Sequence, residues 1–187
     1  MNIPNTLTLA RIAMIPIFVA VIYLPFKGNN IVACLVFSLA AITDALDGYL
    51  ARKLGQTSKL GAFLDPVADK LMVAVVLILL VQLDPRAVLA LPAAVIIGRE
   101  ITISALREWM AELGARSKVA VSVYGKIKTI AQMVALILLT FREPIFGIPV
   151  YTLGLISLYI AAVLTLWSMW QYLVSAWPKL VESNKKQ

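Results

Sequence analysis

The sequence predicts an all-α protein with six transmembrane helices in one domain, residues 1–187. Hydrophobic residues make up 61% of the chain and the mean hydropathy is +0.89, so a soluble domain of this size would lack the polar surface to cover itself. Six apolar stretches are centred near Val19, Val36, Val76, Ala94, Ala135 and Tyr159. The length leaves no room for a sizeable second domain.

The first three spans are predicted from apolar runs of unequal length. The first follows "MNIPNTLTLAR", which has no basic n-region, and no small-residue cleavage site follows near Tyr23, so we interpret it as a retained span. The apolar cores of the second and third, at 31–43 and 71–83, are 13 residues each, whereas a crossing needs about 20. They reach that length only by including "DALDGYLAR" and "GAFLDPVADK", which places the aspartates of both stretches at a membrane boundary.

The fourth span is predicted to continue as an amphipathic helix. Its apolar side chains recur at helical spacing before the glycine at 114: Leu106, Trp109, Met110 and Leu113. The fifth span begins after Gly125. The sixth is predicted from about Pro149 to Trp170, followed by aromatic residues typical of a membrane interface and by a loose basic tail at 181–187.

Basic residues predict the orientation. With six spans, the connections near Lys27, Arg86 and Arg142 lie on one side, and these are three of the 17 Lys and Arg residues. The other 14 fall on the opposite side, which the positive-inside rule makes cytoplasmic. We therefore expect a multi-pass membrane protein with both termini and the paired aspartates on the cytoplasmic side.

Four carboxylates stand out in the stretch "TDALDGYLARKLGQTSKLGAFLDPVADK" at 43–70. The aspartate cluster comprises Asp44, Asp47, Asp65 and Asp69. Residues three or four apart share a helix face, so each pair points one way. Small residues lie on the same strips: Gly48, Ala51 and Gly61. The two helices are expected to pack as antiparallel neighbours, which would bring the four carboxylates together.

Several explanations of the aspartate cluster were weighed. The carboxylates could be solvated interfacial charges, or basic residues could neutralise them: Arg52, Lys53, Lys59 and Lys70. Carboxylates near the bilayer are costly and are functional markers by default. Four hard oxygen ligands, in a chain without histidine, favour Mg²⁺ or Mn²⁺. Two such ions about 3.5–4 Å apart commonly serve phosphoryl chemistry, and a lipid pyrophosphate is a fitting anionic ligand.

The stretch also resembles a family signature. The pattern Asp-x-x-Asp-Gly-x-x-Ala-Arg, eight residues, then Gly-x-x-x-Asp-x-x-x-Asp starts at Asp44 and ends at Asp69. It is similar to the complete motif of the CDP-alcohol phosphotransferase family, whose members transfer a phosphatidyl or similar group from a CDP-linked donor to an alcohol and release CMP. The resemblance implies the family's fold and a homodimer.

The resemblance also implies roles for the motif residues. Asp44, Asp47 and Asp65 would ligate the metals, and Asp69 would be the general base close to them. The expected nucleotide and donor site includes Gly48, Ala51, Arg52 and Gly61. The opening "NIPNTLTLAR" resembles the family's N-terminal segment, in which Asn5, Thr8 and Arg11 would face the nucleotide, although interfacial anchoring would also explain these residues.

The acceptor follows from the segment "GREITISALREWMAELGARSKVAVSVYGKIKTIAQM", which resembles family members that use sn-glycerol 3-phosphate. Its basic residues suit a phosphate dianion, although the positive-inside rule alone explains some of them: Arg99, Arg107, Arg116, Lys118, Lys126 and Lys128. We assign the acceptor phosphate to Arg107, Lys126 and Lys128, with the two lysines preferred. The expected partners are CDP-diacylglycerol, sn-glycerol 3-phosphate and membrane lipids, with no nucleic acid.

Two alternatives stay open. The same chemistry could use another acceptor, namely phosphatidylglycerol, serine or inositol phosphate. A divalent-cation transporter could also use intramembrane aspartates, but transporter sites lie near the midplane between repeats. Here the aspartates are predicted at one boundary, and no repeat is visible in the sequence.

Overall fold

The computed structural model describes residues 3–54, 59–112 and 123–184, and its secondary structure is helical. The helices are α1 (Ile3–Tyr23), α2 (Asn29–Leu54), α3 (Lys59–Leu83), α4 (Ala87–Glu112), α5 (Val123–Phe141) and α6 (Val150–Asn184). In these ranges there is no strand, only an isolated bridge between Ile145 and Ile148. The prediction of an all-α fold is confirmed, and each predicted apolar stretch lies in a helix of its own.

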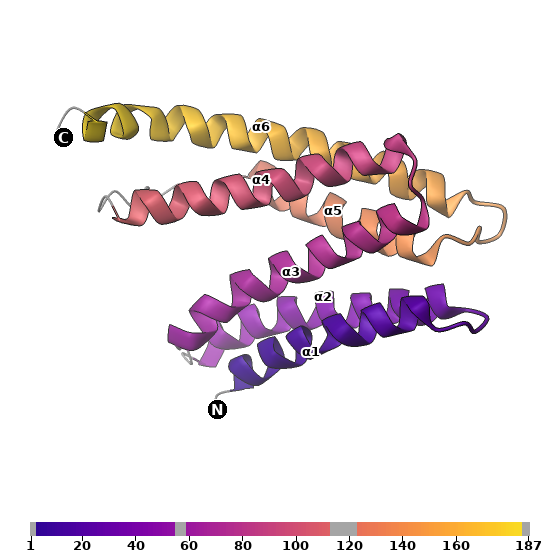
Figure 1. Cartoon of the computed structure of the whole chain (residues 1–187). Coiled ribbons are helices and arrows are strands. Elements are labelled where there is room, and N and C mark those ends of the chain that lie inside the picture. The colour runs from indigo at the N-terminus through magenta and orange to yellow at the C-terminus, as the bar shows by residue number, and fades with distance from the viewer. Residues whose placement is uncertain (1–2, 55–58, 113–122, 185–187) are drawn as a thin grey trace.

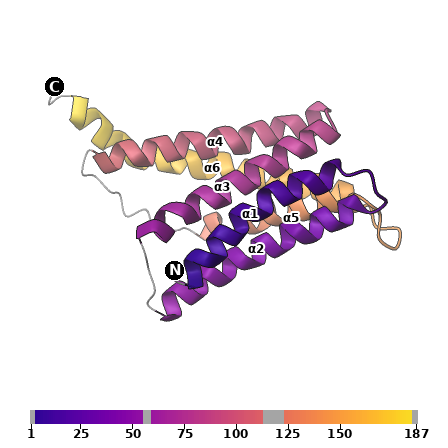
Figure 2. The same cartoon turned by 60° about the horizontal axis from the view of Figure 1, so that its bottom comes forward.

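Two hairpins and two connecting helices build the bundle. α1 packs along α2 and α5 along α6, while α3 contacts α1, α4 and α5, and α4 also packs on α6. Figures 1 and 2 place α3 between the α1–α2 pair on one side and α4 with α6 on the other. Both chain ends lie at one end of the bundle, and the α1–α2, α3–α4 and α5–α6 connections lie at the opposite end (Figure 1).

A single apolar core joins all the described helices. Each helix contributes a large side chain that is at most 1% exposed: Phe18, Phe37, Leu77, Ile96, Leu136 and Leu158. The α5–α6 contact is especially close, since a Cβ on Gly154 would come within 2.9 Å of the Leu139 side chain. Burial of these apolar side chains on interior strips is what orders the bundle.

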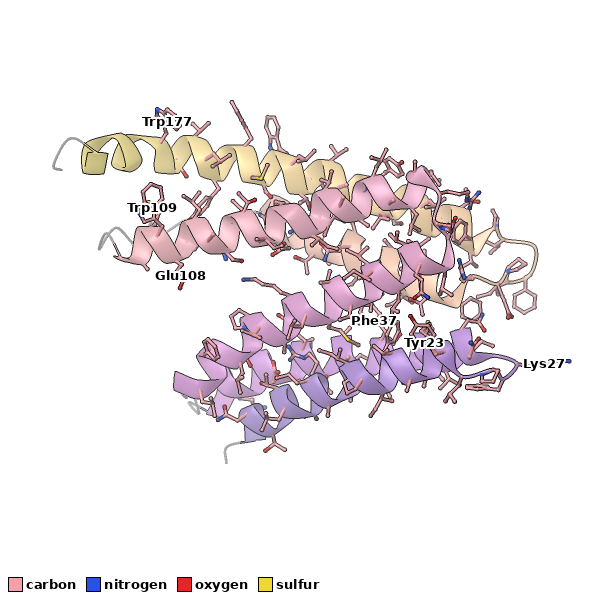
Figure 3. All side chains as sticks on the ribbon, in the orientation of Figure 1. Tyr23, Lys27, Phe37, Glu108, Trp109 and Trp177 are labelled. Atoms are coloured by element: carbon pink, nitrogen blue, oxygen red, sulfur yellow. The ribbon has the colours of Figure 1, made fainter. Side chains whose placement is uncertain are left out.

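The outer surface is apolar as well. Among the described residues, four helices are long and apolar enough to cross a membrane, namely α1, α2, α4 and α6. Residues 127–141 of α5 form a shorter apolar helix, and the described part of α3 does not meet the same measure. Trp109 and Trp177 lie toward one end of the bundle and Lys27 at the other (Figure 3). Large apolar side chains point outward on every helix, which fits a multi-pass membrane protein.

Two helix ends differ from the sequence-based prediction. α6 does not end near residue 170 but continues through Asn184, so the part of the tail up to that residue is helical rather than loose. α4 extends to Glu112, as predicted for an amphipathic continuation, and Met110 is buried there with Ile103 against Tyr172 of α6. Trp109, expected on the same apolar strip, is 45% exposed. The contact with α6 explains why both helices remain ordered beyond the apolar core.

A polar clamp closes the bundle at the end away from the termini. Arg86 donates from Nε and Nη2 to the two carboxylate oxygens of Asp84, both at 2.7 Å, and the hydroxyl of Tyr151 also donates to Asp84. These hydrogen bonds, with that from Arg86 the strongest, hold the pKa of Asp84 below its usual range. The clamp thus ties the α3–α4 turn to the start of α6.

Candidate active site

The aspartate cluster occupies the end of the bundle that holds the termini, because its members lie in the last turns of α2 and the first turns of α3. The predicted direct antiparallel packing of α2 and α3 is wrong: over the described residues these two helices make no extended contact, and α1 packs against both of them instead. Side chains from α1 therefore mediate the approach of the two aspartate pairs.

Arg11 of α1 lies at the centre of the aspartate cluster. Its Nη1 atom is 2.8 Å from Oδ1 of Asp44 and also pairs with Asp69, while its Nη2 atom pairs with Asp47. The side chains of Arg11 and Asp47 are both buried, at 2% and 3% exposure. The buried Nε atom of Arg11 has no hydrogen-bond partner within the described part of the chain. One guanidinium thus contacts three of the four carboxylates.

Thr8, one turn before Arg11, completes the arrangement. Its hydroxyl donates to Oδ1 of Asp65 at 2.6 Å and lies 3.4 Å from Oδ2 of Asp47. Thr8 is fully buried and Asn5, a further turn away on the same face, is 8% exposed. The structure therefore brings Thr8 and Arg11 to the aspartate cluster, and Arg11 contacts the carboxylates themselves, which we did not predict.

Four basic residues could have neutralised the aspartates, but the two whose side chains the structure describes make other contacts. The ammonium group of Lys53 is 5.6 Å from the ring centroid of Tyr49, and that of Lys70 donates to the Ser104 hydroxyl at 2.6 Å. The side chains of Arg52 and Lys59 lie outside the described set, as does that of Ala51. The signal for Arg11 was present in the sequence, because an arginine within an apolar helix requires a buried anionic partner.

The two motif glycines lie beside the aspartates on their helices. Gly48 follows Asp47 directly in α2, and Gly61 lies one turn before Asp65 in α3, where it is buried. Neither carries a side chain that would fill the space next to a carboxylate. That the glycines leave room for a ligand stays a prediction.

The chemistry of the donor set fits hard divalent ions, since four carboxylates offer only oxygen. In the arrangement seen among the described residues, however, no group of three or more acidic side chains is placed to hold a metal ion. The guanidinium of Arg11 lies between the carboxylates and takes up their lone pairs. Metal loading would therefore require Arg11 to give way.

A second polar cluster joins α4, α5 and α6. Oε1 of Glu100 accepts from Lys128 Nζ at 2.7 Å and from Arg99 Nη1 at 2.9 Å. Arg99 Nη2 donates to the Ser168 hydroxyl at 2.9 Å. Lys128 is 7% exposed, so the lysine expected to hold the acceptor phosphate is buried, and it is paired with a glutamate that we did not single out.

The other expected acceptor residues are placed differently or not described. Arg107 is exposed, and its guanidinium lies 5.8 Å from the ring centroid of Tyr172. The side chain of Lys126 and the whole of Arg116 and Lys118 lie outside the described residues. The structure thus joins Lys128 to Arg99 through Glu100.

The two polar clusters are connected through α3 and α4. Lys70, directly after Asp69, donates to the Ser104 hydroxyl, and this hydroxyl donates to the backbone carbonyl of Glu100 at 2.5 Å. A cavity of about 490 Å³ between α3 and α4 is bordered by these three residues and by apolar side chains. The turn of α4 that carries Glu100 is therefore tied to the turn of α3 that carries Asp69.

Comparison with known proteins identifies the family of the chain. The model of the CDP-alcohol phosphatidyltransferase family matches residues 1–167. A CDP-diacylglycerol–glycerol-3-phosphate 3-phosphatidyltransferase of Sodalis glossinidius is 55% identical over 97% of this chain and 98% of its own. Proteins of the same name from Pseudomonas fluorescens (55% identical, covering 100% of this chain and 96% of theirs) and Yersinia pestis (54%, covering 97% and 98%) are similar throughout. The chain belongs to the CDP-alcohol phosphatidyltransferase family.

Proposed function

We propose that this chain transfers the phosphatidyl group of CDP-diacylglycerol to sn-glycerol 3-phosphate, giving phosphatidylglycerophosphate and CMP. Relatives that are about 55% identical over nearly the whole chain carry the name of that reaction. The observation in the molecule that carries the proposal is the convergence of the aspartate cluster around Arg11 and Thr8. Such a site suits a pyrophosphate donor that arrives with divalent ions.

Asp44, Asp47 and Asp65 would hold two Mg²⁺ or Mn²⁺ ions, with Asp69 close to them. When bound, these ions supply positive charge to the donor pyrophosphate and to the leaving phosphate of CMP. Asn5, Thr8 and Arg11 of α1 would face the nucleotide, with Arg11 first releasing the carboxylates. The expected nucleotide site on the helices of the aspartate cluster consists of Gly48, Ala51, Arg52 and Gly61.

Asp69 is suited to act as general base because substrate can reach it. Its side chain is 41% exposed, whereas that of Asp47 is 3% exposed. The acceptor hydroxyl gives its proton to Asp69 while its oxygen forms a bond to the phosphorus that carries diacylglycerol. The bond from that phosphorus to the bridging oxygen breaks, and this oxygen leaves with CMP. The acceptor phosphate is held by cations of α4 and α5: Arg107, Lys126 and Lys128.

The topology belongs to the same proposal. All six helices would cross a bacterial inner membrane as one domain of 187 residues, with the active site and both termini in the cytoplasm and a homodimer as the assembly. The position of both chain ends at the end of the bundle that carries the aspartate cluster supports this orientation (Figure 1), as does the basic bias of that end.

The test is CMP release by the purified protein from CDP-diacylglycerol, with a panel of acceptors and with Mg²⁺ present or chelated. We expect turnover with sn-glycerol 3-phosphate in preference to phosphatidylglycerol, serine and inositol phosphate, and none with chelator. Asp65→Asn should abolish turnover and weaken metal dependence, whereas Asp69→Asn should abolish turnover while donor binding largely survives. Asp84→Asn, a carboxylate change at the opposite end, is the control. Full activity of either cluster variant would contradict the assignment.

A further inference from the structure

We infer that Glu100 is a positioning residue for the acceptor, which acts by holding Lys128 and Arg99 as a preformed phosphate-binding pair. The inference rests on the proposed function and deepens it. Its basis is a partly buried ion cluster of three residues, in which a single glutamate oxygen accepts from Lys128 at 2.7 Å and from Arg99 at 2.9 Å. No role of Glu100 in binding or chemistry follows from the aspartate motif.

Charge explains why a glutamate is needed there. Lys128 is 7% exposed and the Arg99 side chain 13% exposed, and two cations buried side by side without an anion would repel each other strongly. Glu100 compensates one positive charge and leaves the cluster with a net charge of +1. A cluster with this charge remains attractive for a phosphate anion, which charge-assisted hydrogen bonds would hold.

Hydrogen-bonding capacity agrees with this role. An ammonium group has three N–H donors, and Glu100 takes one of those on Lys128. Arg99 uses Nη1 for Glu100 and Nη2 for Ser168, and its buried Nε atom has no partner within the described residues. An unsatisfied buried donor costs free energy unless a ligand accepts from it. The cluster therefore has donors beyond those that its internal pairs use.

α4, which carries Glu100, is also linked to α3, which carries Asp69. The backbone carbonyl of Glu100 accepts from Ser104, which in turn accepts from Lys70, the residue after Asp69. Glu100 also borders the cavity between α3 and α4. A phosphate held by Lys128 and Arg99 would thus be kept at a constant offset from the general base, as transfer to a hydroxyl of the same small molecule requires.

The test is Glu100→Gln, which keeps the size and the hydrogen-bond acceptor but removes the charge. We expect KM for sn-glycerol 3-phosphate to rise about tenfold or more, the effect of losing one charge-assisted contact, with KM for CDP-diacylglycerol unchanged. Glu100→Asp should recover part of the loss. The matched control is Glu143→Gln, an exposed glutamate of the α5–α6 connection at the opposite end of the bundle, for which both KM values should stay at the wild-type level.

A pair of variants tests whether Glu100 acts through Lys128. In a Lys128→Gln background, addition of Glu100→Gln should raise the acceptor KM by clearly less than it does in the wild type, because one of the two cations that Glu100 positions is gone. This pair also serves if the single Glu100 variant does not fold. An unchanged acceptor KM in Glu100→Gln, an equal rise in the donor KM, or a further tenfold rise in the double variant would overturn the inference. Failure of the wild-type protein to release CMP with sn-glycerol 3-phosphate would instead overturn the proposed function.

Discussion

Replacement of Arg11 by methionine should destabilise the metal-free protein strongly and make its stability depend on Mg²⁺. Removing one partner of a buried ion pair costs about 3–5 kcal/mol. Asp44 and Asp69, at 36% and 41% exposure, keep part of their hydration, so only Asp47 is left as a fully buried charge. We therefore expect about 3 kcal/mol, the lower end of that range.

The assay is thermal unfolding of the purified protein in chelator and in excess Mg²⁺. A change of 1 kcal/mol shifts Tm by about 2–4 °C for chains of 150–250 residues, so Arg11→Met should unfold about 6–12 °C below the wild type in chelator. Mg²⁺ should raise Tm more in the variant than in the wild type, because the ions no longer compete with the guanidinium for the carboxylates.

The control for this prediction is Lys53→Met, which removes an exposed cation of α2 and should change Tm little in either condition. Equal Tm values for Arg11→Met and the wild type in chelator would refute the idea that Arg11 holds the aspartate cluster together. An equal effect of Mg²⁺ on both proteins would refute competition between Arg11 and the metal.

Three further predictions concern the acceptor, the turn clamp and the topology. Lys128→Ala should raise KM for sn-glycerol 3-phosphate about ten- to a hundredfold, as expected for loss of a charge-assisted contact of about 1.5–3 kcal/mol. The KM for CDP-diacylglycerol should stay unchanged. Steady-state kinetics measure both constants, and a change confined to the donor KM would contradict the prediction. Asp84→Asn should lower Tm at neutral pH. Because the pKa of Asp84 is depressed in the folded protein, the difference in Tm between variant and wild type should shrink only as the pH falls below the ordinary pKa of 3.8. A constant difference in Tm down to pH 3 would contradict the clamp. A cysteine at Asn29 should be labelled from outside the cell and one at Thr57 should not, and the reverse pattern would invert the proposed topology.

The local features of the fold could be predicted from the sequence, because they depend on periodicity and residue type. Six apolar stretches gave six helices, and the spacing of the aspartates placed each pair on one face. The order of helices in space could not be predicted in the same way. Local patterns do not encode which non-neighbouring helices pack, so the insertion of α1 between the aspartate-bearing helices was missed. The length of α6 was missed because its continuation is stabilised by contact with α4.

Within the candidate site, single charges were easier to predict than their partners. Lys128 was singled out as a basic residue at the start of a span, but its burial against Glu100 depends on the α4–α5 contact. Arg11 was linked to the nucleotide by resemblance, whereas its pairing with three carboxylates depends on the position of α1. In an apolar chain each buried charge needs an opposite charge, and that rule, applied to pairs of helices, could have suggested both contacts.

The opposite charges of the two polar clusters give a physical reason for their separate tasks. Four carboxylates and the guanidinium of Arg11 leave the aspartate cluster with a formal charge of −3, so an anionic pyrophosphate can approach it only together with divalent cations. The cluster of Arg99, Glu100 and Lys128 carries +1 and, in the proposed role, would attract a phosphate without any metal. A donor bound at the first cluster would be repelled less by an acceptor whose phosphate is already neutralised at the second. If the donor and the acceptor exchanged sites, the acceptor phosphate would lie against the carboxylates of the aspartate cluster and be repelled. In this proposal, the difference in charge between the two clusters is what lets one membrane bundle distinguish two phosphorylated substrates.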